Sequence, residues 1–229
     1  MITTAAVCPA PPLLARELTG RAVVLPELRE ACAAAVARLL ASEPAAVLVV
    51  GAGAATATWD ADDRLDLSAW APGLRTRGNS RLPLALGLGA MLLDEAGFTG
   101  RRILQAVGEA EPAAACLRLG AAAADQVEVS ADAAMLVMGD GSARRSPAAP
   151  GHFDERAAPF DLAAEHALRD GDMAAVAAFD AALARDLMAT GRAAWQVLAG
   201  ALGECRPAGE ILYAEAPFGV GYLVAVLGT

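Results

Sequence analysis

The sequence contains no lysine at all, so its 18 basic residues are all arginines. This absence excludes Schiff-base enzymes, pyridoxal-phosphate enzymes that depend on a lysine, and nucleotide-binding loops that place a lysine on phosphate. Aromatic residues make up only 4% of the 229 residues, whereas alanine alone occurs 59 times. We therefore expect a core that is built mainly from leucine, valine and alanine side chains.

Histidine, paired cysteine and positive charge are scarce as well. His152 and His166 are the two histidines of the chain, which leaves little for a histidine-rich metal site. The four cysteines are widely spaced, so the sequence excludes zinc-ribbon and thioredoxin-like motifs. The formal net charge of −9 predicts no nucleic-acid partner, because no basic stripe is present to neutralise phosphates.

The chain also lacks long hydrophobic runs. Residues 1–14 do not have the basic region of a signal peptide and contain three prolines. The apolar stretches 47–59 and 82–93 are too short and too rich in glycine to cross a bilayer. Together with the unpaired cysteines, these features predict a cytoplasmic protein that has no membrane partner.

What is present is an alternation of short apolar runs and helical periodicities, in a chain that is 56% hydrophobic. Apolar runs bounded by turn residues predict strands over residues 2–8, 45–50, 103–107, 134–138, 210–214 and 221–227. Recurrence of apolar residues at three and four positions predicts helices over residues 26–40, 82–95, 112–124, 161–169, 173–188 and 191–202. We interpret residues 60–80 as an exposed excursion and residues 146–159 as a proline-rich loop. The predicted fold class is α/β, a single domain over residues 1–229 with a central, mostly parallel or mixed sheet flanked by helices.

A predicted strand that runs into Gly51-Ala52-Gly53 suggests the turn of a dinucleotide site. Such a site needs a third glycine at position 56 and a helix that starts at once. Position 56 is Thr56, and Trp59 and Asp60 follow instead of a helix. We therefore interpret the two glycines as a turn at the end of a strand.

Three stretches at predicted strand ends are more specific when taken together. They are Cys8-Pro9-Ala10-Pro11-Pro12-Leu13-Leu14, Gly139-Asp140-Gly141-Ser142-Ala143-Arg144 and Ala216-Pro217-Phe218-Gly219-Val220-Gly221-Tyr222. With this combination the chain resembles, over nearly its full length, the class III extradiol ring-cleavage dioxygenases. It is most similar to their catalytic B-subunit superfamily, which includes the Memo-like proteins. In that family the first strand ends in a His-Pro-Pro-Leu type motif, and a later strand ends in Gly-Asp-x-Ser-His.

The resemblance implies an Fe(II) ion held by two histidines and a glutamate, with a further histidine as the acid/base for a catechol substrate. This sequence departs from the family at every one of these histidines. The first ligand histidine falls on Ala10, the catalytic histidine falls on Ala143, and residues 51–70 supply no second ligand histidine. Because an alanine methyl can neither coordinate a metal nor transfer a proton, we expect no metal or other cofactor. Fe(II) is expected only if the family activity is retained.

Several residues remain as candidates for the predicted cleft, and each also has a plain structural interpretation. They are Cys8, Ala10, Asp140, Ser142, Ala143, His152 and Glu215. Asp140 and Ser142 are typical of local hydrogen bonding in a turn, and His152 is equally consistent with an exposed loop imidazole. Glu215 falls in the family's carboxylate region. Cys8 is a small buried hydrophobe unless its thiol faces the cleft.

The sequence leads to one hypothesis and one alternative. We expect a degenerate homologue of the class III extradiol dioxygenases, without metal-dependent ring cleavage, that keeps a small-ligand cleft or serves as an interaction module. The alternative is an active enzyme in the same cleft, either dioxygenase-like or with repurposed metal-free chemistry. The cleft should lie where the strands ending near Cys8, Val50 and Met138 converge. The large apolar fraction also predicts a homo-oligomer or association with a partner subunit.

Overall fold

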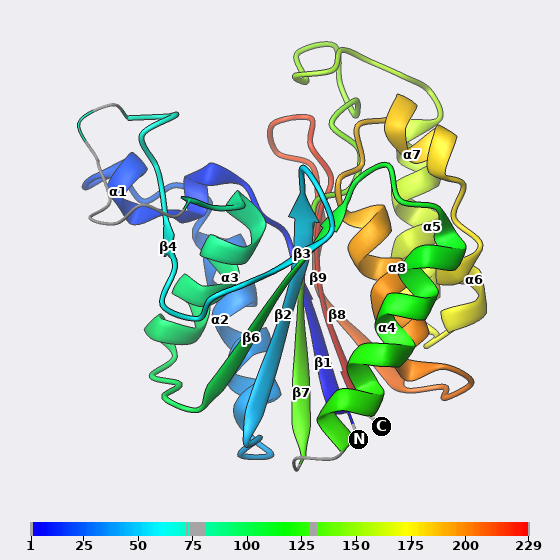
Figure 1. Ribbon diagram of the computed structural model, residues 1–229. Coiled ribbons are helices and arrows are strands. Elements are labelled where there is room, and N and C mark those ends of the chain that lie inside the picture. Colours follow the sequence, from blue (N-terminus) through cyan, green and yellow to red (C-terminus); the bar gives the residue numbers. More distant parts are fainter. Residues whose placement is uncertain (1, 72, 74–80, 129–131, 229) are drawn as a thin grey trace.

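The computed structural model describes residues 2–71, 73, 81–128 and 132–228. A seven-stranded sheet forms its centre, with the strand order β3-β6-β2-β7-β1-β9-β8 (Figure 1). The four strands β6, β2, β7 and β1 are parallel, and the remaining neighbours pair antiparallel. The strands of this sheet are β1 (Ile2–Cys8), β2 (Ala46–Gly53), β3 (Ala57–Trp59), β6 (Arg101–Gly108), β7 (Ala133–Met138), β8 (Ala208–Glu215) and β9 (Tyr222–Gly228). The structure confirms the predicted single α/β domain with a mixed sheet.

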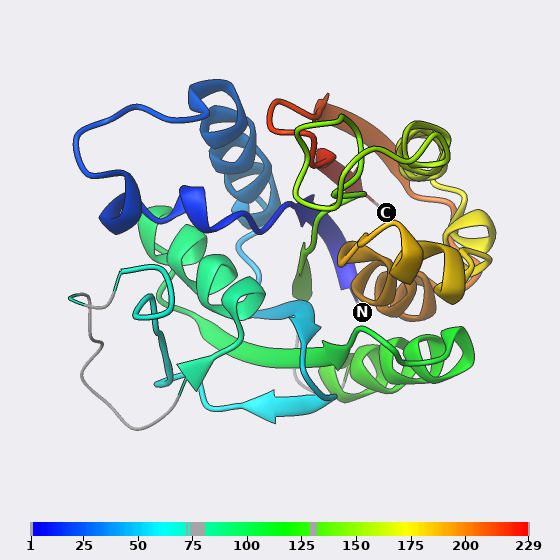
Figure 2. The same ribbon diagram turned by 90° about the horizontal axis from the view of Figure 1, so that it is seen from above.

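Helices cover both faces of this sheet (Figure 2). On one face lie α2 (Pro26–Leu40) and α3 (Leu84–Glu95), together with the short elements η1 (Pro12–Leu14), α1 (Arg16–Thr19), β4 (Arg64–Leu65) and β5 (Arg81–Leu82). The other face carries α4 (Ala113–Glu128), α5 (Ala157–Arg169), α6 (Met173–Ala177), α7 (Ala181–Asp186) and α8 (Gly191–Leu202). Within the described ranges, the structure contains no helix that is both long and apolar enough to cross a membrane.

Alternating side chains of each strand divide between two hydrophobic cores. In β1, Ala5 and Val7 belong to the core beneath α4–α8, whereas Ala6 and Cys8 belong to the core beneath α2 and α3. This division follows from the period of two in a strand, which sends successive side chains to opposite faces. Burial on both faces explains why β2 and β7 are continuous apolar runs in the sequence.

The predicted convergence of three strand ends is confirmed. β7 lies between β1 and β2, and Met138 is the register partner of both Cys8 and Gly51. Because the three strands are parallel, the loops that follow them emerge at one edge of the sheet, which is the upper edge in Figure 1. This carboxyl edge is where we look for a functional site.

Two glycines of α3 lie where other elements approach closely. A Cβ atom on Gly87 would stand 2.6 Å from Leu65 Cδ1, and one on Gly89 would stand 2.6 Å from Val49 Cγ1. The interpretation of Gly51 and Gly53 as a turn is wrong, because both lie within β2. Gly51 is needed there for close packing, since its Cβ would stand 2.6 Å from that of Ala85.

Most predicted elements lie within a few residues of their observed bounds, and the differences have local causes. The predicted helix 173–188 is two helices, because Asp180 caps α7 by accepting a hydrogen bond from the Leu183 N–H at 2.6 Å. Helix α5 begins at Ala157 inside the predicted proline-rich loop, since Pro159 in a first turn costs the helix no hydrogen bond.

The predicted excursion over residues 60–80 is only partly described. Its described part is not wholly exposed, because Leu67 is buried in the core and Arg64–Leu65 forms β4. Residues 72 and 74–80 of this excursion lie outside the described ranges. The sequence also did not predict β3, a short strand of three residues paired with β6.

Candidate functional site

The loops that follow β1 and β7 are in direct contact at the carboxyl edge. The Gly139 N–H donates a hydrogen bond of 2.9 Å to the Cys8 carbonyl oxygen. Further along the two loops, the Ala10 N–H donates to Asp140 Oδ1 at 2.7 Å. The structure therefore brings together Ala10 and Asp140, two of the candidates from distant parts of the sequence.

Asp140 links the β1 loop to the start of α8. Its N–H donates to Thr190 Oγ1 at 3.2 Å, and its carbonyl oxygen accepts from the Gly191 N–H at 2.8 Å. Burial raises the pKa of Asp140 to about 7, although the hydrogen bond from the Ala10 N–H acts in the opposite direction. Burial, and then the charge of Asp140, also raise the pKa of Tyr222. Asp140 is thus a carboxyl group whose charge changes near neutral pH.

Ser142 is fully buried and its hydroxyl is used within the fold. The hydroxyl donates to the Leu187 carbonyl oxygen at 2.9 Å and accepts from the Arg144 N–H at 3.1 Å. The neighbouring Ala143 N–H donates to the same Leu187 carbonyl oxygen at 3.1 Å. These bonds support the interpretation of Ser142 as a residue that stabilises a turn and joins it to the end of α7.

The carboxylate of Asp161 on α5 holds the β7 loop against that helix. Its Oδ1 accepts from the Ser142 N–H and its Oδ2 accepts from Arg145 Nη1, both at 2.8 Å. Burial raises the pKa of Asp161, opposed by these two hydrogen bonds. Two glycines leave room for the carboxylate, because a Cβ on Gly141 or Gly221 would stand 2.5 Å or 2.1 Å from its oxygens. No sequence pattern predicted Asp161 as a site residue.

A cavity of about 400 Å³ lies between α5, the start of β9 and the β7 loop, and we refer to it as the α5 cavity. This volume falls within the range of small-molecule sites in proteins. Its walls are mostly apolar, and its charged groups include Asp161 paired with Arg145 and Glu165 paired with Arg169. The residues that line it are Gly141, Arg145, Ala158, Pro159, Asp161, Leu162, Ala164, Glu165, Trp195, Ala214, Glu215, Gly221, Tyr222 and Leu223.

Of the seven predicted candidates, Glu215 is the one that lines the α5 cavity. Cys8 is fully buried in the core beneath α2 and α3. A hydrogen bond with Cys32, and then burial, hold the pKa of its thiol well above the ordinary value. Ala10 is buried in the same core, with 7% of its surface exposed. The thiol of Cys8 therefore belongs to the core rather than to a cleft.

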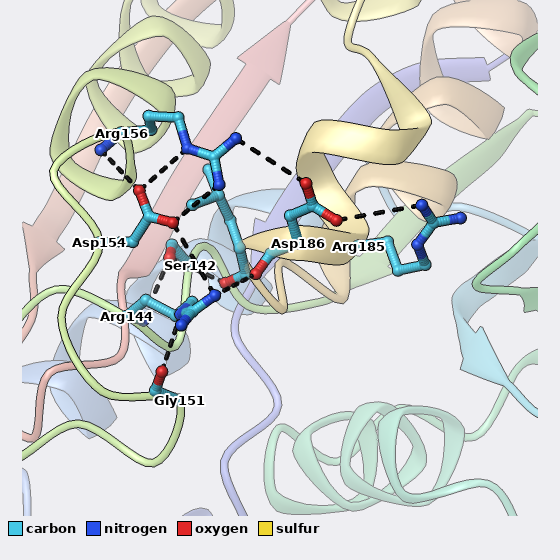
Figure 3. A network of polar contacts seen from close by, with 8 residues as sticks. Ser142, Arg144, Gly151, Asp154, Arg156, Arg185 and Asp186 are labelled. Atoms are coloured by element: carbon cyan, nitrogen blue, oxygen red, sulfur yellow. Dashed lines mark hydrogen bonds and ion pairs between the residues drawn. The ribbon is translucent and has the colours of Figure 1, made fainter.

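His152 lies in an exposed part of the β7–α5 loop and has a positive φ of 58°. Its N–H donates to the Ala149 carbonyl oxygen at 2.9 Å, which agrees with the interpretation as a loop residue. The same loop is fixed to α7 by a network of polar contacts (Figure 3). Arg144 donates to the Gly151 carbonyl oxygen at 2.7 Å and to the Asp186 carbonyl oxygen at 2.9 Å.

An ion pair in the same network, Asp154 with Arg156 at 2.8 Å, orders the end of the loop (Figure 3). Hydrogen bonds from Arg156 lower the pKa of Asp154 to about 2. Arg156 also reaches Asp186 on α7 at 3.8 Å. The long segment between β7 and α5 therefore has a defined conformation although it contains no regular element.

The side chains at the family positions do not fit a mononuclear iron site. Ala10 and Ala143 offer methyl groups where the resemblance implies histidines, and a methyl group has no lone pair for a metal. Across the parts of the chain that the structure describes, no three His, Cys, Asp or Glu side chains are grouped to hold a metal ion.

Comparison with known proteins reveals a likeness of fold. No family model matches the sequence, and none of the curated proteins matches it either. The crystal structure of an uncharacterized protein, JW3007 from Escherichia coli K12, is similar with a TM-score of 0.53 and 12% sequence identity. The match covers 99% of this chain and 100% of that chain. The chain therefore shares its fold, over nearly its whole length, with that bacterial protein.

Proposed function

We propose that this protein binds a small, neutral and mostly apolar molecule in the α5 cavity, and that it is a relative of the class III extradiol dioxygenases without metal-dependent ring cleavage. The α5 cavity is the observation that carries the proposal. It lies at the loop that follows Met138, at the edge of the sheet where open α/β folds bind their ligands.

The charges around the α5 cavity favour a neutral ligand. Arg145 is paired with Asp161 at 2.8 Å, and Glu165 is paired with Arg169 one turn along α5. The register of β8 with β9 pairs Glu215 with Tyr222, whose side chain packs in the core beneath α2 and α3. The carboxylate of Glu215 therefore points to the α2 side of the sheet, since paired residues share a face. Within the α5 cavity, the charged groups Asp161, Arg145 and Glu165 are therefore each neutralised by a partner of opposite charge.

The loss of ring cleavage is proposed from the side chains themselves. The family chemistry needs histidines to bind the metal and to move the proton of the substrate hydroxyl. Ala10 and Ala143 can do neither. Asp140, which changes charge near neutral pH, is bonded to the backbone of the β1 loop, where it fixes the two loops together.

A neutral fluorescent dye, N-phenyl-1-naphthylamine, tests the proposed site. We expect saturable binding with one dye per chain, because the α5 cavity can hold a molecule of this size. Leu162→Trp should weaken binding about tenfold by filling the cavity, and Ala158→Phe should act in the same direction. Val23→Trp is the control, because Val23 is 78% exposed and does not line the cavity. Dye binding that does not saturate, or that survives both cavity variants, would contradict the proposed function.

A further inference from the structure

Strand β8 ends the sheet, and its outer edge pairs with no other strand of the described chain. Such an edge presents backbone N–H and C=O groups that can pair with another extended chain. The strand is eight residues long, and Ala208, Glu210, Ala214 and Glu215 are exposed along it. It is thus long enough to accept an added strand.

A groove of about 620 Å³ runs beside this edge on the α2 face of the sheet, and we refer to it as the α2–β8 groove. The small residues Ala31 and Ala34 are among those that line it. Its walls carry three carboxylates, Glu27 and Glu30 from α2 and Glu215 from β8. All three side chains are in exposed positions, so they face an incoming partner directly.

The negative charge of the α2–β8 groove is not neutralised by the residues that line it. No arginine is among its described lining residues. Arg38 of α2 is already paired with Glu210 of β8, at 2.6 Å. The same negative charge acts on Tyr213, since burial and then the charges of Glu215 and Glu27 raise the pKa of its hydroxyl.

From this juxtaposition of an unpaired strand edge and an acidic groove, we propose that β8 binds an extended peptide segment of a partner protein that carries arginine or lysine at alternate positions. An added strand would point every second side chain into the α2–β8 groove, where its positive charges would meet Glu27, Glu30 and Glu215. Ala214 and Glu215 also border the α5 cavity, so the intervening side chains would lie at the mouth of that cavity and should be small and apolar.

A second copy of this chain fits the same edge poorly. Antiparallel pairing of two β8 strands would bring Glu27, Glu30 and Glu215 of both copies to one interface. Each copy carries a net charge of −9, and like charges across an interface are unfavourable. The charge of the groove thus favours a basic partner over self-association. The inference does not depend on the small-molecule site proposed above.

The test uses a labelled seven-residue peptide that alternates arginine and valine, measured by fluorescence anisotropy with the full-length protein. A peptide of the same composition, with its arginines in one block, is the matched control. We expect the alternating peptide to bind about fivefold or more tightly than the block peptide, because only strand addition requires alternation. Hydrogen exchange should show added protection of the β8 amides over Ala208–Glu215.

Charge-neutral variants complete this test. The double variant Glu27→Gln with Glu30→Gln should weaken binding about fivefold or more at low salt, with a smaller effect at high salt. Glu17→Gln with Glu204→Gln is the matched control, since both residues are exposed and neither lines the groove. Equal affinity for the block peptide, unchanged β8 exchange, or β8 protection that depends on protein concentration without peptide would each overturn the inference. Protection that depends on protein concentration would show that the β8 edge pairs with a second copy of this chain.

Discussion

The carboxyl edge of the sheet is packed on one face and open on the other. On the α2 and α3 side, Ala10 and Cys8 are packed into a closed hydrophobic core, and the free thiol of Cys8 shares a hydrogen bond with that of Cys32. On the α5 side, the same edge opens into a cavity of about 400 Å³ beside Asp161 and Arg145. The position where a family ligand histidine is expected is therefore filled, and the free space lies across the sheet from it.

This difference separates a filled position from an open one at a single edge of the sheet. Once a position such as Ala10 carries a small apolar side chain, its surroundings can close over it and gain packing free energy. The loop after β7 keeps its position through backbone and carboxylate hydrogen bonds, which do not depend on the absent imidazoles. The predictions below test whether the closed side and the open side have these separate roles.

The largest effect is expected where Asp161 is enclosed. Gly221→Ala should lower the free energy of unfolding by about 3 kcal/mol, because the new methyl would displace a carboxylate that bonds Ser142 and Arg145. Gly228→Ala, at the end of β9, is the control, since a Cβ there would meet no atom within 4 Å. Urea denaturation measures both variants, and similar stabilities for the two would show that Asp161 is not fixed.

The closed side should not tolerate a large polar side chain. Ala10→His should destabilise the protein by about 2 kcal/mol, because it inserts an imidazole into a packed core. Ala33→His, at an exposed position on α2, should be close to neutral. Thermal unfolding compares the two variants. An Ala10→His protein as stable as the original would mean that space for a ligand remains at this position.

Asp140, which joins the loops after β1 and β7, should make the free energy of unfolding depend on pH. Its folded-state pKa of about 7 lies above the ordinary value of 3.8, so the folded protein holds a proton that the unfolded chain releases. The free energy of unfolding should therefore fall as the pH rises from about 4 to 7. Asp140→Asn keeps an oxygen acceptor for the Ala10 N–H and should remove most of this fall. Parallel pH profiles for the two proteins, from denaturant unfolding, would refute the assignment.

The smallest effect is expected when a metal ion is added to the protein. Protein purified without an affinity tag should contain well under one Fe(II) or Zn(II) ion per chain, because Ala10 and Ala143 provide no donor atoms. Added Fe(II) should neither raise the melting temperature nor support oxygen uptake with catechol. Elemental analysis that finds about one ion per chain, lost on Glu215→Ala, would instead restore the enzyme hypothesis.

Most of the fold was accessible from the sequence. Hydrophobic periodicity located β1, α2 and α8 at their observed bounds, because strands buried on both faces and amphipathic helices leave strong local patterns. Weak elements were missed for the converse reason. Strand β3 has only three residues, and the break between α6 and α7 depends on the capping side chain of Asp180.

The candidate site was less predictable. The sequence pointed to the loop after β7, and the contact of Ala10 with Asp140 agrees with that. It did not point to Asp161, whose role depends on the approach of Gly221 from a segment 60 residues away in the chain.

By itself, the sequence determined the alternation of strands and helices, the absence of lysine chemistry and the alanines at positions 10 and 143. These are local properties, since each depends on residue identity or on spacing along the chain. Only the tertiary structure decided that Cys8 faces Cys32, that Asp140 is buried enough to change charge near neutral pH, and that a cavity opens beside α5. Burial, desolvation and cavity shape arise from segments distant in the chain, and no local pattern encodes their approach.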